Sequence, residues 1–209
     1  MFIQQGDVVL FQGDSITDTH RDRETDTLGT GYVYIASSIF SSLYPEKQVQ
    51  FINRGISGNQ VADLEARWDE DCLNLRPDVL SILIGINDCW RRYSRGLHTT
   101  TESYLQSYQN LLERLQEHSS TTKLILMEPF LVPALPEQKA WREDLDPKIQ
   151  AVRELAREYG ALYVPLDGLF AAACTRREPG FWAPDGVHPS PAGHALIARA
   201  WLQAVGVDI

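Results

Sequence analysis

Five short apolar segments recur along this chain, separated by stretches of helical periodicity. They are rich in branched or aliphatic side chains and span residues 8–11, 49–52, 79–84, 124–127 and 161–164. Apolar runs of this length are typical of strands that are covered on both faces, as in a parallel sheet. Strands that alternate with helices favour right-handed crossovers. The pattern therefore predicts an α/β fold with a five-stranded parallel sheet.

The stretches between these segments place apolar residues on one side of a helix. The predicted faces comprise Val61, Leu64, Trp68, Cys72 and Leu75; Tyr104, Tyr108, Leu111 and Leu115; and Ile149, Val152, Ala156 and Tyr159. Such faces pack against a sheet. A last helix is expected from about Pro191 to Ala204, with Ser190 as its N-cap. Because no linker or repeat interrupts the pattern, residues 1–209 are expected to form one domain.

The composition argues against nucleic acid and membrane partners. The 209 residues carry a formal net charge of −9, whereas nucleic acids and anionic membranes attract basic surfaces. No apolar stretch reaches the length of a membrane span, and the first 12 residues lack the features of an export signal. Three widely spaced cysteines fit reduced thiols better than disulfides. We therefore expect a cytoplasmic protein, for which a homo-oligomer is an open alternative.

Four polar blocks lie next to the predicted strands and the last helix. Residues 13–15, 57–58 and 85–88 follow the first, second and third strands, and residues 185–188 precede the last helix. Ligands of doubly wound sheets bind outside the carboxyl ends of the strands. We therefore expect these blocks to meet at one edge of the sheet.

The first and last of these blocks supply the groups of a serine hydrolase. Serine becomes a strong nucleophile when a histidine accepts its proton and a third group orients that histidine. Ser15 is the predicted nucleophile, His188 the base and Asp185 the orienting carboxylate. His188 is favoured over the other histidines because only His188 has a carboxylate three residues upstream in a constrained loop. The Gly-x-Ser-x-Gly elbow of α/β-hydrolases is absent, which disfavours that fold.

The blocks resemble the signature blocks of the GDSL esterases, also called SGNH hydrolases. They are residues 13–18, 53–59, 85–88 and 185–189. Within this family the chain is most similar to intracellular acetyl-xylan esterases that act on xylo-oligosaccharides, through residues 29–32, 66–68 and 85–91. The resemblance implies a three-layer α/β/α, flavodoxin-like fold. It also implies a serine esterase without cofactor or metal, whose partner is a small acyl ester such as an acetylated sugar.

The resemblance further implies an oxyanion hole, formed by the backbone N–H groups of Ser15 and Gly58 and the side-chain amide of Asn87. Aromatic residues near the same loops are expected to line the substrate pocket and to stack on sugar rings, the alternative being core or interface positions. These residues are Tyr32, Trp90 and Trp182. The chain departs from the family pattern where Pro184 occupies a position at which such esterases carry a tryptophan.

Three other functions remain open at this level. A lipolytic esterase or thioesterase of the same fold would keep every catalytic residue and differ in pocket depth. A metal hydrolase would use Asp14, Asp18, His20, Asp185 and His188 as ligands, although their spacing matches no tight metal motif. A binding module without activity would keep the fold, because each block alone is also consistent with an ordinary turn.

Overall fold

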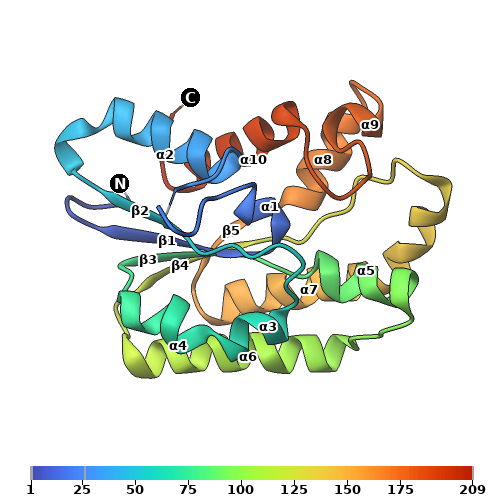
Figure 1. The fold of residues 1–209 in the computed structure, drawn as a ribbon, viewed down its shortest axis with the longest axis horizontal. Helices are drawn as coiled ribbons and strands as arrows, with labels where there is room; N and C mark the ends of the chain where they lie inside the picture. The colour runs from blue at the N-terminus through green and yellow to red at the C-terminus, as the bar shows by residue number, and fades with distance from the viewer. Residues whose placement is uncertain (1, 26, 209) are drawn as a thin grey trace.

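One parallel sheet forms the centre of the computed structural model, which describes residues 2–25 and 27–208 (Figure 1). Its strands are β1 (Val8–Gly13), β2 (Gln50–Asn53), β3 (Val79–Leu83), β4 (Lys123–Met127) and β5 (Leu162–Val164). Their order is β2-β1-β3-β4-β5, and all neighbouring pairs are parallel. The five predicted strands are confirmed.

Helices cover both faces of the sheet, so the predicted three-layer α/β/α fold is confirmed (Figure 1). One layer contains α2 (Tyr32–Leu43), α8 (Leu166–Cys174) and α10 (Pro191–Ala204). The other contains α3 (Val61–Ala66), α4 (Trp68–Asp71), α5 (Ile86–Arg95), α6 (Thr101–His118) and α7 (Arg142–Glu158). The shorter elements are α1 (Ser15–Asp18), α9 (Pro179–Trp182) and the 3₁₀ helices Pro45–Lys47, Leu73–Leu75 and Pro136–Trp141.

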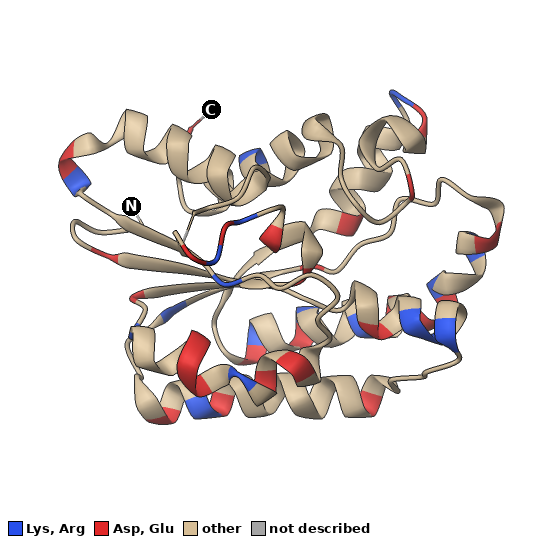
Figure 2. Cartoon of the chain, viewed as in Figure 1, with Lys and Arg blue, Asp and Glu red and all other residues tan. Residues whose placement is uncertain are grey.

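The charged residues are distributed unevenly between these layers. They gather on the helices of the α3–α7 layer, whereas α2 and α10 carry few (Figure 2).

Within the described residues, no helix is both long enough and apolar enough to cross a membrane.

Each strand divides its side chains between two apolar cores, because successive residues of a strand point to opposite faces. In β1, Phe11 packs into the core on the α2 and α10 side, whereas Leu10 packs into the core on the α3 and α6 side. Trp201 of α10 joins the sheet to its helix layer. Its ring centroid lies 5.1 Å from that of Phe11, and its Nε1 donates to Ser81 Oγ at 3.1 Å.

The expectation of one helical face over residues 61–75 needs correction. These residues form α3, α4 and a 3₁₀ helix, because the backbone leaves the helical region at Arg67 (φ −114°, ψ 13°) and Cys72 (φ −133°, ψ −66°). The Arg67 side chain donates to Asn59 Oδ1 at 2.9 Å and to Asp71 Oδ2 at 2.7 Å. The short helices still bury the predicted apolar residues except Leu75, which is half-buried.

Replacement of Trp201 by alanine tests the contact between α10 and the sheet. Trp201 is fully buried, so the substitution leaves a cavity and removes the donor to Ser81. We expect Trp201→Ala to lower the free energy of unfolding by about 3–5 kcal/mol, measured by urea denaturation. A loss below about 1 kcal/mol would show that α10 is not anchored in this way.

Candidate active site

Ser15 lies two residues after the last residue of β1, as the first residue of α1. Asp14 is the N-cap of this short helix, and its Oδ1 accepts a hydrogen bond from Ile16 N at 3.0 Å. Aspartate is a favoured N-cap because its carboxylate satisfies an N–H group that has no partner within the helix. The Gly-Asp-Ser sequence therefore places the serine hydroxyl at the carboxyl edge of the sheet.

Ser15, His188 and Asp185 form a continuous chain of hydrogen bonds. Ser15 Oγ lies 2.9 Å from His188 Nε2, and His188 Nδ1 lies 2.6 Å from Asp185 Oδ2. Two N–H groups donate to Asp185 Oδ1, from Val187 at 3.0 Å and from His188 at 2.7 Å. This geometry lets His188 accept a proton from Ser15 while Asp185 fixes the orientation of the imidazole.

The environment of Asp185 keeps its carboxyl group ionised. Partial burial opposes the charge, but hydrogen bonds from the His188 ring and from the N–H groups of His188 and Val187 outweigh it and lower the pKa of Asp185. An ionised carboxylate is the form that stabilises an imidazolium on its neighbour. The predicted pairing of Asp185 with His188 thus has the geometry and the charge state that a base requires.

Gln138 braces the loop that carries Asp185 and His188, a role that the sequence analysis missed. The Gln138 side chain is buried; its Nε2 donates to Asp185 O at 2.6 Å, and its Oε1 accepts from Ala134 N and Leu135 N, each at 3.0 Å. Gly186 packs against this amide at φ +81°, where an added Cβ would collide with it. No local pattern marks Gln138, because the contact joins segments that are far apart in the sequence.

The three predicted oxyanion donors lie in segments that follow β1, β2 and β3 at the carboxyl edge of the sheet. Within the described part of the chain, the N–H groups of Ser15 and Gly58 donate to no other group, so both are free to meet a ligand. Asn87, in the first turn of α5, uses one N–H of its amide to donate to Asn59 O at 3.0 Å. Because an amide nitrogen carries two N–H groups, one remains for a ligand.

Two hollows lie beside these groups. The larger, of about 330 Å³, is lined by Ser15, Ile16, Thr19, His20, Ser57, His188, Pro189 and His194. The smaller, of about 270 Å³, is lined by Gly58, Asn87, Trp90, Arg91, Ser94 and Arg95. The half-buried Trp90 ring meets the His188 ring edge to face, with centroids 5.8 Å apart. Trp90 thus lies beside the imidazole of His188, and its contact with a substrate stays a prediction.

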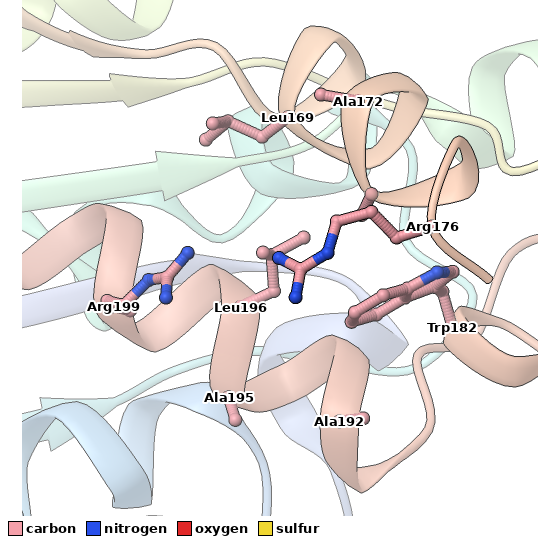
Figure 3. A pocket seen from close by; sticks show the side chains of 9 residues that line it. Leu169, Ala172, Arg176, Trp182, Ala192, Ala195, Leu196 and Arg199 are labelled. Atoms are coloured by element: carbon pink, nitrogen blue, oxygen red, sulfur yellow. The ribbon is translucent and has the colours of Figure 1, made fainter.

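The expectations for Tyr32 and Trp182 need correction. Tyr32 is fully buried in the core, where its hydroxyl lies 3.1 Å from Thr17 Oγ1, so no substrate can reach its ring. Trp182 lines neither hollow at Ser15. It lies beside Arg176 and Leu196 in a separate hollow of about 510 Å³ between α8 and α10 (Figure 3). That hollow contains no member of the predicted triad.

Four of the residues weighed as metal ligands, Asp14, Asp18, Asp185 and His188, make hydrogen bonds to other groups. Among residues 2–25 and 27–208, no group of three or more His, Cys, Asp or Glu side chains is arranged to hold a metal ion. Asp18 Oδ2 instead accepts from Ser57 N at 3.0 Å and from Ser57 Oγ at 2.8 Å. Asp18 therefore ties the loop after β2 to α1.

These features define a hydrolase with a three-layer α/β/α fold, and comparison with known proteins identifies its family. The chain belongs to the GDSL-like lipase/acylhydrolase family, whose model matches residues 11–196, and it is a carboxylic ester hydrolase. The family predicted from the four blocks is therefore confirmed.

An acetylxylan esterase from Geobacillus stearothermophilus is 39% identical over 215 residues, a match that covers 100% of this chain and 98% of that protein. A solved structure of an acetylxylan esterase from this organism superposes with a TM-score of 0.92 at 37% identity, covering 100% of this chain and 98% of the other. A GDSL-like lipase from Parabacteroides merdae superposes with a TM-score of 0.94 at 38% identity, covering 99% of each chain.

Two buried carboxyl groups near the site make stability depend on pH. Burial raises the pKa of Asp14 to about 7 and that of Asp88 to about 8, whereas an aspartate in an unfolded chain titrates near about 3.9. Between these pKa values the folded protein binds more protons than the unfolded chain, so the free energy of unfolding falls as pH rises toward about 8. His194 has the opposite effect on the free energy of unfolding at lower pH, because burial lowers the pKa of His194 to about 4.

We therefore expect the melting temperature to fall as pH rises from about 6.5 to about 8.5, and Asp88→Asn to reduce that decline. The asparagine keeps an oxygen that can accept from Val61 N, as Asp88 does, but it does not titrate. Thermal unfolding of both proteins across this range provides the measurement. Equal declines in the two proteins would show that Asp88 is already ionised in the folded state at the start of the range.

Proposed function

We propose that the protein is an acetylesterase acting on carbohydrate esters such as acetylated xylo-oligosaccharides, with Ser15, His188 and Asp185 as its triad. The observation that carries this proposal is the hydrogen-bonded series from Ser15 Oγ through His188 to Asp185, at 2.9 and 2.6 Å. Solved structures of the acetylxylan esterase from Geobacillus stearothermophilus include catalytic mutants in which a serine, an aspartate or a histidine is replaced by alanine. The same three residue types meet here.

In the first half of the reaction, His188 Nε2 accepts the Ser15 hydroxyl proton while Ser15 Oγ attacks the acetyl carbonyl carbon. The carbonyl oxygen becomes an oxyanion, which accepts hydrogen bonds from Ser15 N–H, Gly58 N–H and the Asn87 amide. When the tetrahedral intermediate collapses, the bond to the sugar oxygen breaks, and His188 donates its proton to that oxygen. The sugar alcohol leaves, and the acetyl group stays on Ser15.

In the second half, water takes the place of the alcohol. The water oxygen attacks the acetyl-serine carbonyl carbon while His188 accepts a proton from that water. The second oxyanion accepts hydrogen bonds from the same three donors. Collapse breaks the bond to Ser15 Oγ and returns the proton from His188 to the serine. Asp185 stays ionised throughout and stabilises the imidazolium that forms in each half.

The surroundings of Ser15 favour a small acyl group on a polar alcohol. Histidine, serine and threonine side chains line much of the hollow that contains Ser15, and two arginines and a serine line the one beside Trp90. Neither hollow has the continuous apolar lining that a long acyl chain requires. The ring of Trp90 offers an apolar face of the kind on which sugar rings stack.

Ester hydrolysis by the wild type and by Ser15→Ala tests this function. We expect wild type to hydrolyse p-nitrophenyl acetate and peracetylated xylobiose, and Ser15→Ala to lose about 10⁴-fold or more in kcat on both. The assay follows nitrophenolate release and acetate release.

Equal activity of the mutant would refute the triad. Wild-type activity that rises from acetate to octanoate esters, without activity on the sugar ester, would instead support a lipolytic esterase or a thioesterase.

Trp90 should distinguish sugar esters from simple esters. Loss of an aromatic contact costs about 1 kcal/mol of binding free energy. We therefore expect Trp90→Ala to raise KM for acetylated xylobiose about five- to tenfold. KM for p-nitrophenyl acetate should change by less than about twofold. Trp182→Ala is the matched control, because Trp182 lines a different hollow. A KM increase of the same size in the control would assign sugar recognition to another part of the surface.

A further inference from the structure

We propose that Arg91 is a positioning residue for the oxyanion hole. Its guanidinium group holds the loop of residues 57–60 against α5, so that the N–H of Gly58 and the amide of Asn87 are directed at the same point. This inference rests on the proposed function, because it concerns the same oxyanion, and it assigns a role to a residue outside the triad and the three donors.

Three side chains on one face of α5 contact the loop and Val61, the first residue of α3. Asn87 donates to Asn59 O at 3.0 Å, and Asp88 Oδ2 accepts from Val61 N at 3.2 Å. One turn further along, Arg91 donates through Nη1 to Gln60 Oε1 at 2.7 Å and through Nη2 to Gly58 O. Residues 87, 88 and 91 share a face because residues three and four apart are neighbours on a helix.

Arg91 acts on the peptide that follows Gly58. The Gly58 N–H belongs to the peptide between Ser57 and Gly58, and the peptide before it is fixed because Ser57 N donates to Asp18 Oδ2. On the C-terminal side of this N–H, the backbone of Gly58 has φ +83°, a conformation that glycine adopts easily and can also leave easily. The Arg91 contact with Gly58 O fixes the peptide that follows. The N–H is thereby held between two anchored peptides.

The contact requires a guanidinium group and not only a positive charge. A guanidinium presents several N–H groups in a rigid planar fork and can reach two acceptors at once, whereas an ammonium acts as a point charge on a flexible stem. Arg91 uses its fork on Gly58 O and Gln60 Oε1, and Asp63 Oδ2 lies 3.9 Å from Nη2. The Arg91 side chain is 27% exposed, so its truncation removes the contacts without leaving a cavity in the core.

The proposal predicts a loss in kcat with little change in KM. The oxyanion exists only in the transition state and the intermediate, so a misdirected donor weakens transition-state binding more than substrate binding. Removal of one oxyanion donor typically costs about 10²–10³ in kcat, and a misplaced donor costs somewhat less. We expect Arg91→Ala to lose about 10- to 100-fold in kcat on p-nitrophenyl acetate, with KM within about twofold of wild type.

Three variants test the role. Arg91→Ala removes the contacts, Arg91→Lys keeps the charge without the fork, and Arg92→Ala removes the same charge one residue along α5, where Arg92 contacts Glu143 and Asp144 of α7. We expect Arg91→Lys to recover only a small part of the lost kcat and Arg92→Ala to keep wild-type kcat. Added ethylguanidinium should raise kcat of Arg91→Ala and leave that of Arg91→Lys unchanged, while thermal unfolding checks that each variant is folded.

Binding of a tetrahedral mimic supplies a readout that a general loss of stability would not produce. A phenylboronic acid forms a tetrahedral adduct with an active-site serine, and its Ki should rise in Arg91→Ala by about the same factor as kcat falls. A folded Arg91→Ala with kcat and Ki within about twofold of wild type would overturn the role. So would full activity of Arg91→Lys or an equal loss in Arg92→Ala. If Ser15→Ala keeps its activity, the proposed function itself fails.

Discussion

The position of β1 between β2 and β3 brings the segments that carry Ser15, Gly58 and Asn87 to one place. Because the strands are parallel and in register, with Phe11 opposite Asn53 and Gly13 opposite Leu83, they end at one edge of the sheet. The chain leaves β1 toward Ser15, β2 toward Gly58 and β3 toward Asn87. In a sheet of this order, the neighbourhood of β1 and β3 is the topological switch point where ligands bind. The proposed nucleophile and two of the proposed oxyanion donors therefore come from segments that the sheet itself holds together.

His188 and Asp185 reach this edge from the other end of the chain, and their placement depends on packing. Ser190 caps α10 by accepting from Gly193 N at 3.2 Å, and Trp201 anchors the same helix to the sheet through Ser81. Gln138 fixes the loop just before the helix by donating to Asp185 O. The loop that carries His188 is thus held by α10 on one side and by the Gln138 amide on the other. These contacts keep His188 Nε2 2.9 Å from Ser15 Oγ.

Local patterns were sufficient to predict the strands, the cap of α10 and the meeting of Ser15, His188 and Asp185 at one edge of the sheet. Each of these depends on residues near one another in the sequence, or on the rule that loops meet at the carboxyl edge of a parallel sheet. The expectations for Tyr32 and Trp182 were based on their nearness to the polar blocks in the sequence, which does not show where a side chain points. Tyr32 begins α2, whose buried residues include Val33, Ala36 and Phe40; a test for that helical face would have assigned it to the core. Gln138 and Arg91 act across long sequence separations and carry no local signal.

In the proposed reaction, Ser15 attacks an ester carbonyl whose oxygen then accepts hydrogen bonds from Ser15 N–H, Gly58 N–H and the Asn87 amide. A crystal structure of the protein treated with a serine-directed phosphonate would test this arrangement. We expect one covalent adduct, on Ser15 Oγ, with a phosphonyl oxygen about 3 Å from the N–H nitrogens of Ser15 and Gly58 and from Asn87 Nδ2. An adduct on another residue, or a phosphonyl oxygen directed away from these three donors, would contradict it.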